Sequence, residues 1–373
     1  MWLIPAILAL VFISFLISFF PFVAALLFPA RKKSPLLEPA PRNIDVIVPC
    51  HNEEGRLRTT LESVSHAADE LHIYYPEVEV RIRCGLDACS DATWLDAHQF
   101  GAEIVTFKHR SKWKVINDLV STSDSDWLIL VDAGVTWDKR ILRNSIPFLA
   151  VNDVVSFSPS YTTARSGLLG RLHWALEAFI KSYENRSGGP ISVHGATVFY
   201  RSSSLKLVLR ILAGRTWIND DVVIPLMMRC VFPGKRIIYS RNSAIGFTVC
   251  DRAPRAPSSE KIARERVARG NIQWIRFLVP IVIEWNIPVF IVSMRRIARL
   301  YWAIVPIAIA FSTSVAIFEY FPSNVLIGFA LASFSMCLQL FTFYKIPGFM
   351  ASIRSLFHLI TGKREQKENV LWQ

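Results

Sequence analysis

Asp45-Val-Ile-Val-Pro-Cys-His-Asn-Glu-Glu54 is the stretch of sequence that decides the fold. Its first part, residues 45–49, is a short apolar run that ends at a proline, which is typical of a strand buried in a sheet. The polar residues 51–54 follow at once. A buried strand with polar side chains at its carboxyl end predicts a sheet whose edge carries a binding site.

The residues after this stretch alternate between helical and extended patterns with short connections. Such alternation predicts an α/β domain with a mostly parallel, Rossmann-like sheet covered by helices. Ligands bind such sheets at the carboxyl ends of the strands. The expected helices cover 54–75, 92–99 and 112–121, and the expected strands cover 78–86, 103–107 and 127–131.

The composition separates the ends of the chain from its middle. Of 373 residues, 52% are hydrophobic and 19% are charged, and the apolar residues are concentrated at the two ends. The net charge of +12 favours anionic partners, such as phosphates or acidic lipid surfaces. No recognition-helix, zinc-finger or RNP-like pattern accompanies this charge, so we expect no nucleic-acid partner. The 6 cysteines show no Cys-x-x-Cys spacing and are expected to be reduced thiols.

Three apolar segments predict an integral, multi-pass membrane protein. Residues 2–28 carry no charge and are long enough to cross the ~30 Å hydrocarbon core, whereas a signal peptide has a basic start and a shorter apolar core. The basic run 31–33 follows and marks that end as cytoplasmic. Residues 300–318 and 324–344 predict a hairpin that enters and leaves on the cytosolic side, because basic residues flank it on both outer ends.

These patterns predict a cytosolic domain held at a membrane (the inner membrane if the cell is bacterial). Pro280, Glu284 and Pro288 interrupt the apolar stretch before the hairpin, so we expect it to lie at the interface rather than to cross. The expected parts are an N-terminal transmembrane helix (1–30), a linker (31–43), the α/β domain (44–275), an interfacial segment (276–299), two transmembrane helices (300–345) and an amphipathic cytosolic tail (346–373).

Acidic side chains follow the expected strands. Glu53 and Glu54 follow the first strand, Asp87 the second and Asp132 the fourth. Carboxylates gathered at one sheet edge can surround a nucleotide and a hard cation such as Mg²⁺ or Mn²⁺, which neutralises a pyrophosphate. A single Asp after a strand is as often a helix N-cap, so both readings stay open for each position taken alone.

Three motifs now carry a resemblance to a known family. Val46-Ile-Val-Pro-Cys-His-Asn-Glu-Glu54, Asp87-Ala-Cys-Ser-Asp-Ala-Thr93 and Ser111-Lys-Trp-Lys-Val-Ile-Asn117 resemble, in order and spacing, motifs of the family 2 glycosyltransferases. These enzymes have the GT-A fold, and the family includes ceramide glucosyltransferase and the chitin and hyaluronan synthases. The resemblance covers residues 45–275 and implies a GT-A domain that binds a nucleotide-sugar donor, with a UDP-sugar expected.

The resemblance also implies roles on the donor side. Pro49 and Asn52 belong to the opening motif of the nucleotide-sugar site. Glu53 and Asp87 are implied to flank the base, and Lys112 to approach the diphosphate as a compact cation. The alternative for Lys112 is a solvent-exposed lysine at the first position of a helix.

Val131-Asp-Ala-Gly-Val135 lies where the family has its Asp-x-Asp metal motif. The resemblance implies that Asp132 binds the diphosphate-bound Mg²⁺ or Mn²⁺. Gly134 stands in place of the second Asp, so one expected carboxylate is missing. Water or another residue is one way to complete the metal's coordination, since Mg²⁺ commonly keeps waters.

Two later motifs are similar to the acceptor side and the catalytic base of the family. His194-Gly-Ala-Thr-Val-Phe-Tyr-Arg201 resembles the strand beside the acceptor, which implies acceptor contacts for Gly195 and Arg201. Trp217-Ile-Asn-Asp-Asp221 precedes a helical pattern, and Asp221 is implied to be the catalytic base, with Asp220 as its neighbour or substitute. A helix N-terminus keeps such a base ionised. The alternative is that both carboxylates only cap the helix.

The last motif, Arg264-Glu-Arg-Val-Ala-Arg-Gly270, lies where the family has Gln-x-x-Arg-Trp. Arg266 matches the arginine and is implied to act in catalysis by stabilising the departing diphosphate, while Arg269 is assigned to the acceptor. A basic helix on anionic headgroups is the alternative. Val267 replaces the tryptophan that stacks on the acceptor sugar in polymer-making members.

We therefore expect an inverting glycosyltransferase that moves one sugar from a nucleotide-sugar, with UDP favoured, to a lipid or membrane-proximal acceptor such as a glycan. A processive polysaccharide synthase of the same family is the first alternative, although the missing tryptophan and the few spans count against it. A catalytically inactive, GT-like membrane scaffold is the second, and Gly134 is its best support.

Overall fold

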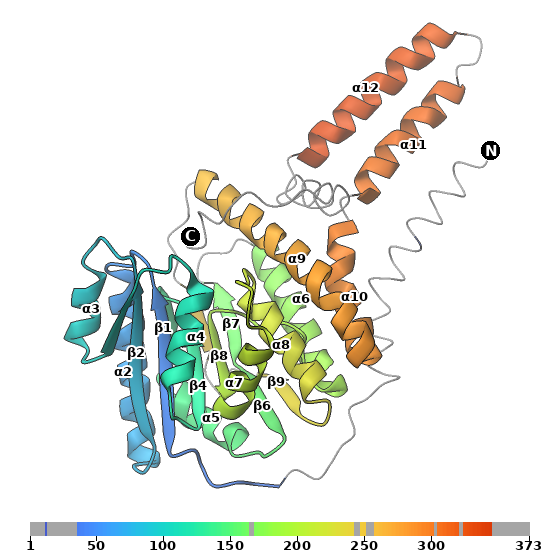
Figure 1. The fold of residues 1–373 in the computed structure, drawn as a ribbon. Coiled ribbons are helices and arrows are strands. Elements are labelled where there is room, and N and C mark those ends of the chain that lie inside the picture. The colour runs from blue at the N-terminus through green and yellow to red at the C-terminus, as the bar shows by residue number, and fades with distance from the viewer. Residues whose placement is uncertain are drawn as a thin grey trace. The chain divides into compact units, whose positions relative to one another are not determined.

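A computed structural model describes residue 12 and residues 36–163, 168–241, 247–250, 257–301, 304–320 and 324–344. These residues fall into two compact units: a sheet unit that ends at Ser259 and a helical unit that begins at Glu260. The helices and strands of both units are labelled in Figure 1.

The sheet unit is built on a seven-stranded sheet with the order β3-β2-β1-β4-β8-β6-β9. Neighbouring strands from β3 to β4 pair in parallel, β8 is antiparallel to both β4 and β6, and β9 is parallel to β6. The sheet is therefore mixed but mostly parallel, as predicted. The strands are β1 (Asn43–Cys50), β2 (Glu79–Asp87), β3 (Glu103–Phe107), β4 (Trp127–Val131), β6 (Val154–Ser158), β8 (Thr197–Arg201) and β9 (Arg236–Tyr239).

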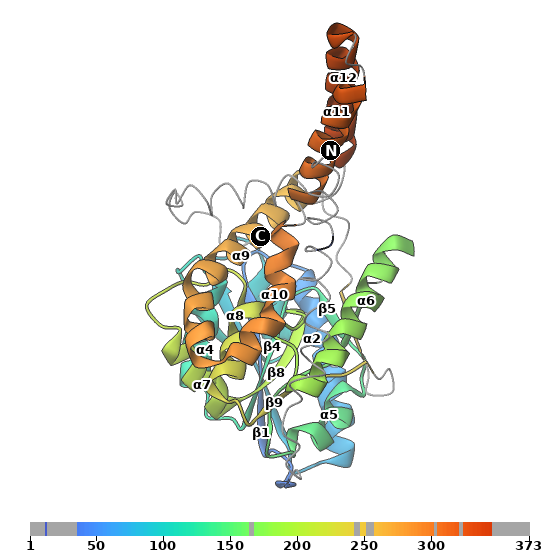
Figure 2. The ribbon, with the colours of Figure 1, turned by 90° about the vertical axis from the view of Figure 1, so that its right-hand side faces the viewer.

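Helices cover both faces of this sheet. On one face α2 packs against α5, and on the other α4 packs against α7, which contacts α8 (Figure 2). Helix α3 contacts α2 at the β3 end of the sheet. The bounds are α2 (Arg56–Tyr74), α3 (Thr93–Gln99), α4 (Lys112–Thr122), α5 (Ile141–Leu149), α6 (Leu168–Glu184), α7 (Ser202–Ile211) and α8 (Asp220–Val231), with a 3-10 turn η1 (Asn185–Ser187) after α6.

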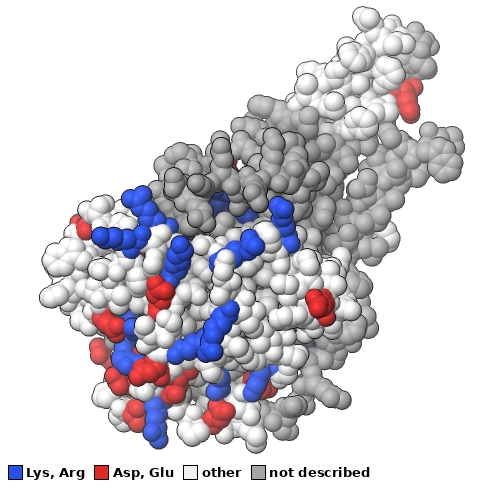
Figure 3. All heavy atoms as spheres, viewed as in Figure 1, with Lys and Arg blue, Asp and Glu red and all other residues white. Residues whose placement is uncertain are grey.

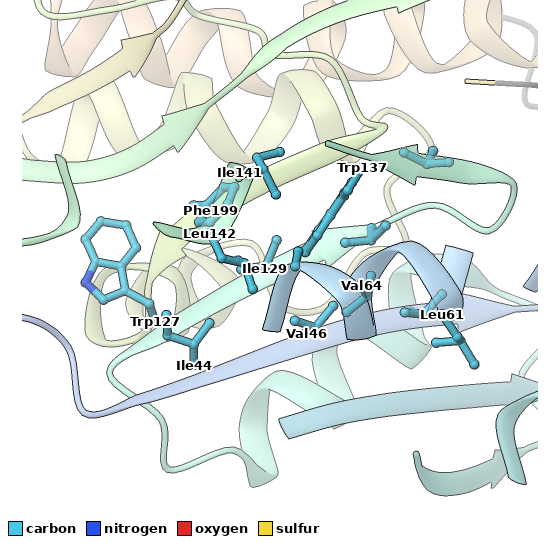
Figure 4. Packing of buried hydrophobic residues seen from close by; sticks show 14 of the residues in the cluster. Ile44, Val46, Leu61, Val64, Trp127, Ile129, Trp137, Ile141, Leu142 and Phe199 are labelled. Carbon is cyan, nitrogen blue, oxygen red and sulfur yellow. The ribbon is translucent and has the colours of Figure 1, made fainter. Parts of the chain in front are cut away.

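The hydrophobic core explains why the opening stretch forms a central strand. Seven of the eight residues of β1 are buried, and β4 is buried throughout. Apolar side chains of these strands pack against the inner faces of α2 and α5 (Figure 4). Removing this apolar area from water is the main stabilising term. The core includes Ile44, Val46, Leu61, Val64, Trp127, Ile129, Trp137, Ile141, Leu142 and Phe199.

A second, three-stranded sheet follows directly from β4. Its order is β5-β10-β7, with β10 antiparallel to β5 and parallel to β7. Residues 132–134 form the turn that joins β4 to β5, so this small sheet fixes the chain just beyond the carboxyl end of β4. The strands are β5 (Val135–Trp137), β7 (Ser160–Thr163) and β10 (Phe247–Cys250).

The helical unit contains α9 (Pro257–Trp285) from Glu260 onward, together with α10 (Ile287–Tyr301), α11 (Ile304–Tyr320) and α12 (Val325–Tyr344). Helix α9 runs through residue 275, where a domain boundary was predicted, and tolerates Pro280 in its interior. Helices α11 and α12 lie side by side, and the Gln339 amide donates to the Thr313 hydroxyl over 2.7 Å. Within the described ranges, no helix combines the length and the apolarity that crossing a bilayer requires. The predicted span at 1–30 and the tail at 346–373 lie outside the described residues, apart from residue 12.

Candidate active site at the edge of the sheet

Four segments meet at one edge of the large sheet. Strands β1, β2 and β4 are parallel, so their carboxyl ends lie at the same edge. Strand β8 runs the opposite way, and its first residue, Thr197, pairs with the last residue of β4, Val131. The segments 51–55, 87–93, 132–134 and 194–196 are therefore neighbours. We call this edge the rim.

Asp87 fixes the start of α4 at the rim. Its buried carboxylate accepts hydrogen bonds from the backbone N–H groups of Arg110, at 2.9 Å, and Ser111, at 2.6 Å. The Ser111 hydroxyl then caps α4 by accepting from the N–H of Lys114. Asp87 thus positions the helical turn that carries Lys112. The predicted contact of Asp87 with a nucleotide base stays a prediction.

The segment 51–55 is tied to the segment after β2. Asn52 adopts a positive φ of 53°, and its side-chain oxygen accepts from the Ser90 N–H at 2.8 Å. The Glu53 N–H donates to the Thr93 hydroxyl at 2.8 Å. Burial raises the pKa of Asp91, but hydrogen bonds from Thr93 and neighbouring backbone groups outweigh it, so the pKa is lowered. Pro49 is buried at the end of β1, directly before this segment.

Lys112 joins two of the predicted carboxylates. Its ammonium lies 2.8 Å from Asp132 Oδ1 and 3.1 Å from Asp220 Oδ2. Burial disfavours the charge on Lys112, yet attraction to these two carboxylates raises its pKa well above that of an ordinary lysine. The lysine therefore stays cationic and links the turn after β4 to the start of α8.

Asp220 and Asp221 occupy the first turn of α8, where the N-terminal N–H groups favour negative charge. The backbone C=O of Asp221 accepts from the N–H of Val193 at 3.0 Å. A Cβ placed on Gly195 would lie 3.5 Å from the Cβ of Asp221. The predicted base is therefore adjacent to the predicted acceptor glycine. Burial, together with the charges of both aspartates, raises the pKa of Tyr200 well above its ordinary value.

Arg56 was not marked by any sequence motif, and its guanidinium lies beside Gly134, the residue that stands in place of the second Asp of the metal motif. Gly134 has a positive φ of 84°, and a Cβ there would lie 2.8 Å from Arg56 Nη2. Arg56 also forms an ion pair with Glu53 at 2.7 Å. The Gly134 N–H donates to the Thr60 hydroxyl at 2.8 Å, which holds the turn against α2.

These residues do not by themselves form the metal site that the sequence predicts at Asp132. Its carboxylate is bonded to Lys112, and Gly134 has no side chain to offer. Throughout the described residues, no group of three or more His, Cys, Asp or Glu side chains is placed to hold an ion. Asp132 is the one carboxylate that the predicted motif keeps, and Mg²⁺ is commonly bound by one or two carboxylates together with substrate phosphates and waters, so Asp132 fits a divalent cation that the donor diphosphate would also ligate.

An aromatic cluster adjoins the rim beside Gly195, and sequence reasoning missed it. The His194 ring stacks on Tyr161 with 5.1 Å between centroids and meets the rings of Trp174 and Tyr239 edge-on. The buried Lys181 ammonium lies 3.3 Å from His194 Nδ1 and 3.4 Å from Nε2. The only sequence signal was the position of His194 directly before the acceptor motif.

Arg201, which the resemblance assigned to the acceptor site, is not brought to the rim by the structure. It ends β8 and pairs with Trp127, the first residue of β4, so it lies at the opposite edge of the sheet from Thr197, about 13 Å away. Its guanidinium donates to the C=O groups of Val154 and Val151, each at 3.1 Å, and pairs with Glu38 at 2.8 Å. These bonds fasten the linker to the sheet. Antiparallel β8 brings only its amino end to the rim.

Arg266 and Arg269 lie on α9 in the helical unit. Their assigned roles at the departing diphosphate and the acceptor stay predictions.

A mostly parallel α/β sheet with Lys112 between Asp132 and Asp220 at its rim, and with Asp221 next to Asp220 at the start of α8, is the arrangement expected of a glycosyltransferase with the GT-A fold. The model of the "glycosyltransferase like family 2" matches residues 41–270, which is more than half of the chain. The chain belongs to this family and is a glycosyltransferase.

Solved structures support the fold. The mannosyltransferase PcManGT from Pyrobaculum calidifontis, solved with GDP-Man and Mn²⁺, is 17% identical, and the match covers 97% of this chain and 100% of that one with a TM-score of 0.67. Glucosyl-3-phosphoglycerate synthase from Mycobacterium tuberculosis, solved with phosphoglyceric acid, is a weaker match that does not bear on the fold: it is 15% identical with a TM-score of 0.41, covering 61% of this chain and 78% of that one. No curated protein sequence matches the chain.

Proposed function

We propose that this enzyme transfers a single sugar, with inversion, from a nucleoside-diphosphate sugar to a hydroxyl of a lipid or membrane-proximal acceptor. The observation that carries the proposal is the continuous polar path across the rim. Lys112 bonds both to Asp132, after β4, and to Asp220, which directly precedes the proposed base. A donor diphosphate held near Lys112 therefore lies within reach of Asp221.

Asp221 serves as the general base in this proposal. The N-terminus of α8 favours its ionised form, and the adjacent negative charge of Asp220 increases its proton affinity. Asp221 accepts the proton of the acceptor hydroxyl while that oxygen forms its bond to the anomeric carbon. The bond from that carbon to the diphosphate breaks on the opposite face, so a single displacement inverts the configuration. General base catalysis of this kind contributes about 10²–10⁴ in rate.

Two protein features orient the reactants. The Lys112 ammonium supplies a fixed positive charge for phosphate oxygens. Gly195 leaves room for the acceptor beside Asp221, because its Cβ would stand 3.5 Å from that of the aspartate. PcManGT, a mannosyltransferase of similar fold, was solved with the nucleotide sugar GDP-Man and Mn²⁺. The UDP preference of this chain rests on the sequence motifs.

A lipid acceptor and a location at a membrane are supported by charge and by the apolar ends of the sequence. Lys108, Arg110 and Lys114 are exposed around the start of α4, next to the rim. Figure 3 shows several Lys and Arg side chains, with some Asp and Glu side chains among them, on the face of the sheet unit where α4 and α7 lie in Figure 1. Anionic headgroups attract such a surface. The uncharged run 2–28 is the proposed anchor, with the sheet unit in the cytosol.

The proposal is tested with the full-length chain in detergent micelles or vesicles. UDP- and GDP-sugars are offered with a membrane lipid extract, and release of nucleoside diphosphate and the mass of the product are recorded. We expect release with one donor class and a product enlarged by one sugar. A ladder of oligomers would instead indicate a processive synthase, and no release with any donor would remove the enzymatic proposal.

A variant pair gives the residue-level control. Asp221→Asn removes the base and is expected to abolish transfer, whereas Asp69→Asn changes an exposed carboxylate on α2 and is expected to keep it. Unchanged transfer in Asp221→Asn would assign the base elsewhere.

A further inference from the structure

Helix α6 exposes apolar side chains and buries charged ones, which is the reverse of an ordinary surface helix. Leu176 and Phe179 are 57% and 48% exposed. Glu177, Lys181 and Glu184 on the same helix are buried. We infer that the outward face of α6 lies in the interface of a bilayer that contains anionic lipid. This inference rests on the proposed function, because it names the surface from which a lipid acceptor reaches the same site.

The outward face of α6 is a continuous apolar stripe. Leu176, Phe179 and Tyr183 are three and four positions apart, so they line one side of the helix, and we call them the α6 stripe. The buried charged residues lie on the opposite side, where α6 contacts β7, β9 and η1. Figure 2 shows α6 on the outside of the sheet unit. Because the charged side is the packed one, the sheet unit itself leaves the α6 stripe uncovered.

Two arginines border the α6 stripe. The guanidinium carbon of Arg186 lies 5.0 Å from the centroid of the Tyr183 ring, and that of Arg241 lies 5.6 Å from the centroid of the Phe179 ring. Both arginines are exposed, whereas neither acidic residue between 174 and 186 is exposed. Apolar and aromatic side chains bordered by arginine are typical of helices that lie in the interface of anionic membranes.

The charge of this face also distinguishes a bilayer from a second copy of the chain. A two-fold dimer across the α6 stripe would bring Arg186 and Arg241 of both copies to one contact, where like charges oppose association. Lipid phosphates instead attract guanidinium groups and accept bidentate hydrogen bonds from them. The stems of the arginines can lie along the apolar stripe while their charged heads reach the headgroups. An anionic bilayer is therefore the partner that this face fits.

The inward side of the same helix reaches the acceptor side of the rim. The Trp174 ring meets the His194 ring edge-on, with 5.2 Å between centroids, and the Lys181 ammonium lies 3.3 Å from His194 Nδ1. Gly195, which adjoins Asp221, follows His194 directly. A bilayer surface at α6 is therefore next to the proposed acceptor site, so a lipid hydroxyl has a short path to the proposed base.

The experiment uses photo-crosslinking of the full-length chain in nanodiscs of phosphatidylcholine and phosphatidylglycerol. Phe179→p-benzoylphenylalanine places a photoreactive group on the α6 stripe, and mass spectrometry identifies its adducts after irradiation. The matched control is Ile73→p-benzoylphenylalanine, at an exposed apolar residue at the end of α2. We expect a lipid adduct from position 179 that exceeds that of the control about fivefold or more. Cross-links to another segment of the chain or to a second copy, equal adducts at both positions, or no adduct would overturn the inference.

Lipid composition and a variant pair test the two arginines. In phosphatidylcholine alone, we expect the lipid adduct at Phe179→p-benzoylphenylalanine to fall about threefold or more, because anionic headgroups attract arginine. Arg186→Gln combined with Arg241→Gln should remove this dependence on anionic lipid. Arg58→Gln combined with Arg210→Gln, at exposed arginines on α2 and α7, should keep it. Equal dependence in the two double variants would overturn the role of the arginines at the α6 stripe, and thermal melting checks that each variant is folded.

The transfer assay separates this inference from the proposed function. Sugar transfer to a lipid without a lipid adduct at position 179 would overturn the inference and leave the proposed function standing. A lipid adduct at position 179 without release of nucleoside diphosphate from any donor would support the surface and remove the proposed function.

Discussion

The two sides of the rim are built in different ways. On the donor side, the segments after β1 and β2 are joined by side-chain-to-backbone bonds such as that from the Ser90 N–H to Asn52, and Asp87 at the end of β2 accepts from the N–H groups of Arg110 and Ser111. On the acceptor side, Gly195 lies between the aromatic cluster around His194 and the first turn of α8. Hydrogen bonds fix direction as well as distance, whereas stacked rings tolerate small shifts. In the proposed function, this difference suits a constant donor group on one side and a variable acceptor on the other.

The largest expected effect separates chemistry from donor binding. Asp221→Asn removes the proposed base, and we expect kcat to fall by about 10²–10⁴ while the nucleotide dissociation constant changes little. Rates and nucleotide binding are measured on the same preparation, with Asp69→Asn as control. A loss of nucleotide binding equal to the loss of rate would place Asp221 on the donor side.

The next prediction removes a hydrogen-bond acceptor, the Asp87 carboxylate, from the donor side. Asp87→Ala leaves the N–H groups of Arg110 and Ser111 without their acceptor, and one of them is buried. We expect the free energy of unfolding to fall by about 2–3 kcal/mol. Nucleotide binding should weaken as well, since the turn that carries Lys112 loses its support. Urea unfolding and calorimetry measure the two effects, and an unchanged unfolding free energy would show that the carboxylate is not a structural anchor.

A smaller effect should mark the acceptor side alone. His194→Gln removes the imidazole ring from the aromatic cluster but keeps polar atoms there. We expect KM for the acceptor to rise about tenfold, with the donor dissociation constant unchanged, because the Lys112 pairs stay intact. If donor binding fell instead, the two sides would not be separable.

The smallest effect concerns pH. The pKa of Lys112 is raised above the ordinary value, so the stability that its pairing contributes is fully present below the pKa of an unfolded lysine, about 10.4, and is lost only as the pH rises through the higher folded-state pKa. The difference in unfolding free energy between wild type and Lys112→Met should therefore be constant from about pH 6 to about pH 9. A difference that declines across this range would show that Lys112 titrates there.

The donor side could be predicted from sequence because its residues lie within short motifs. The predicted strands at 103–107 and 127–131 match β3 and β4 residue for residue, and the acidic positions after the strands do gather at one edge. Local patterning determines these features, since a buried strand and the turn after it are neighbours in the chain.

Features that depend on strand direction or on distant elements could not be predicted in this way. Arg201 was assigned to the acceptor because it shares a motif with Gly195, but antiparallel β8 carries it to the opposite edge. Arg56 reaches Gly134 from α2, across 78 positions of sequence, and no spacing rule connects them. The aromatic cluster combines residues from β7, α6 and β9 with His194, so it exists only after folding.

The proposed mechanism depends most on Asp221 acting as the general base of a single displacement, next to a donor diphosphate held at Lys112. The direct measurement is proton NMR of the product formed from a donor whose sugar is α-linked to the diphosphate. We predict a β-linked product from the first turnover onward, and no product from Asp221→Asn. An α-linked product would contradict the single displacement, and with it the role of Asp221 as the base.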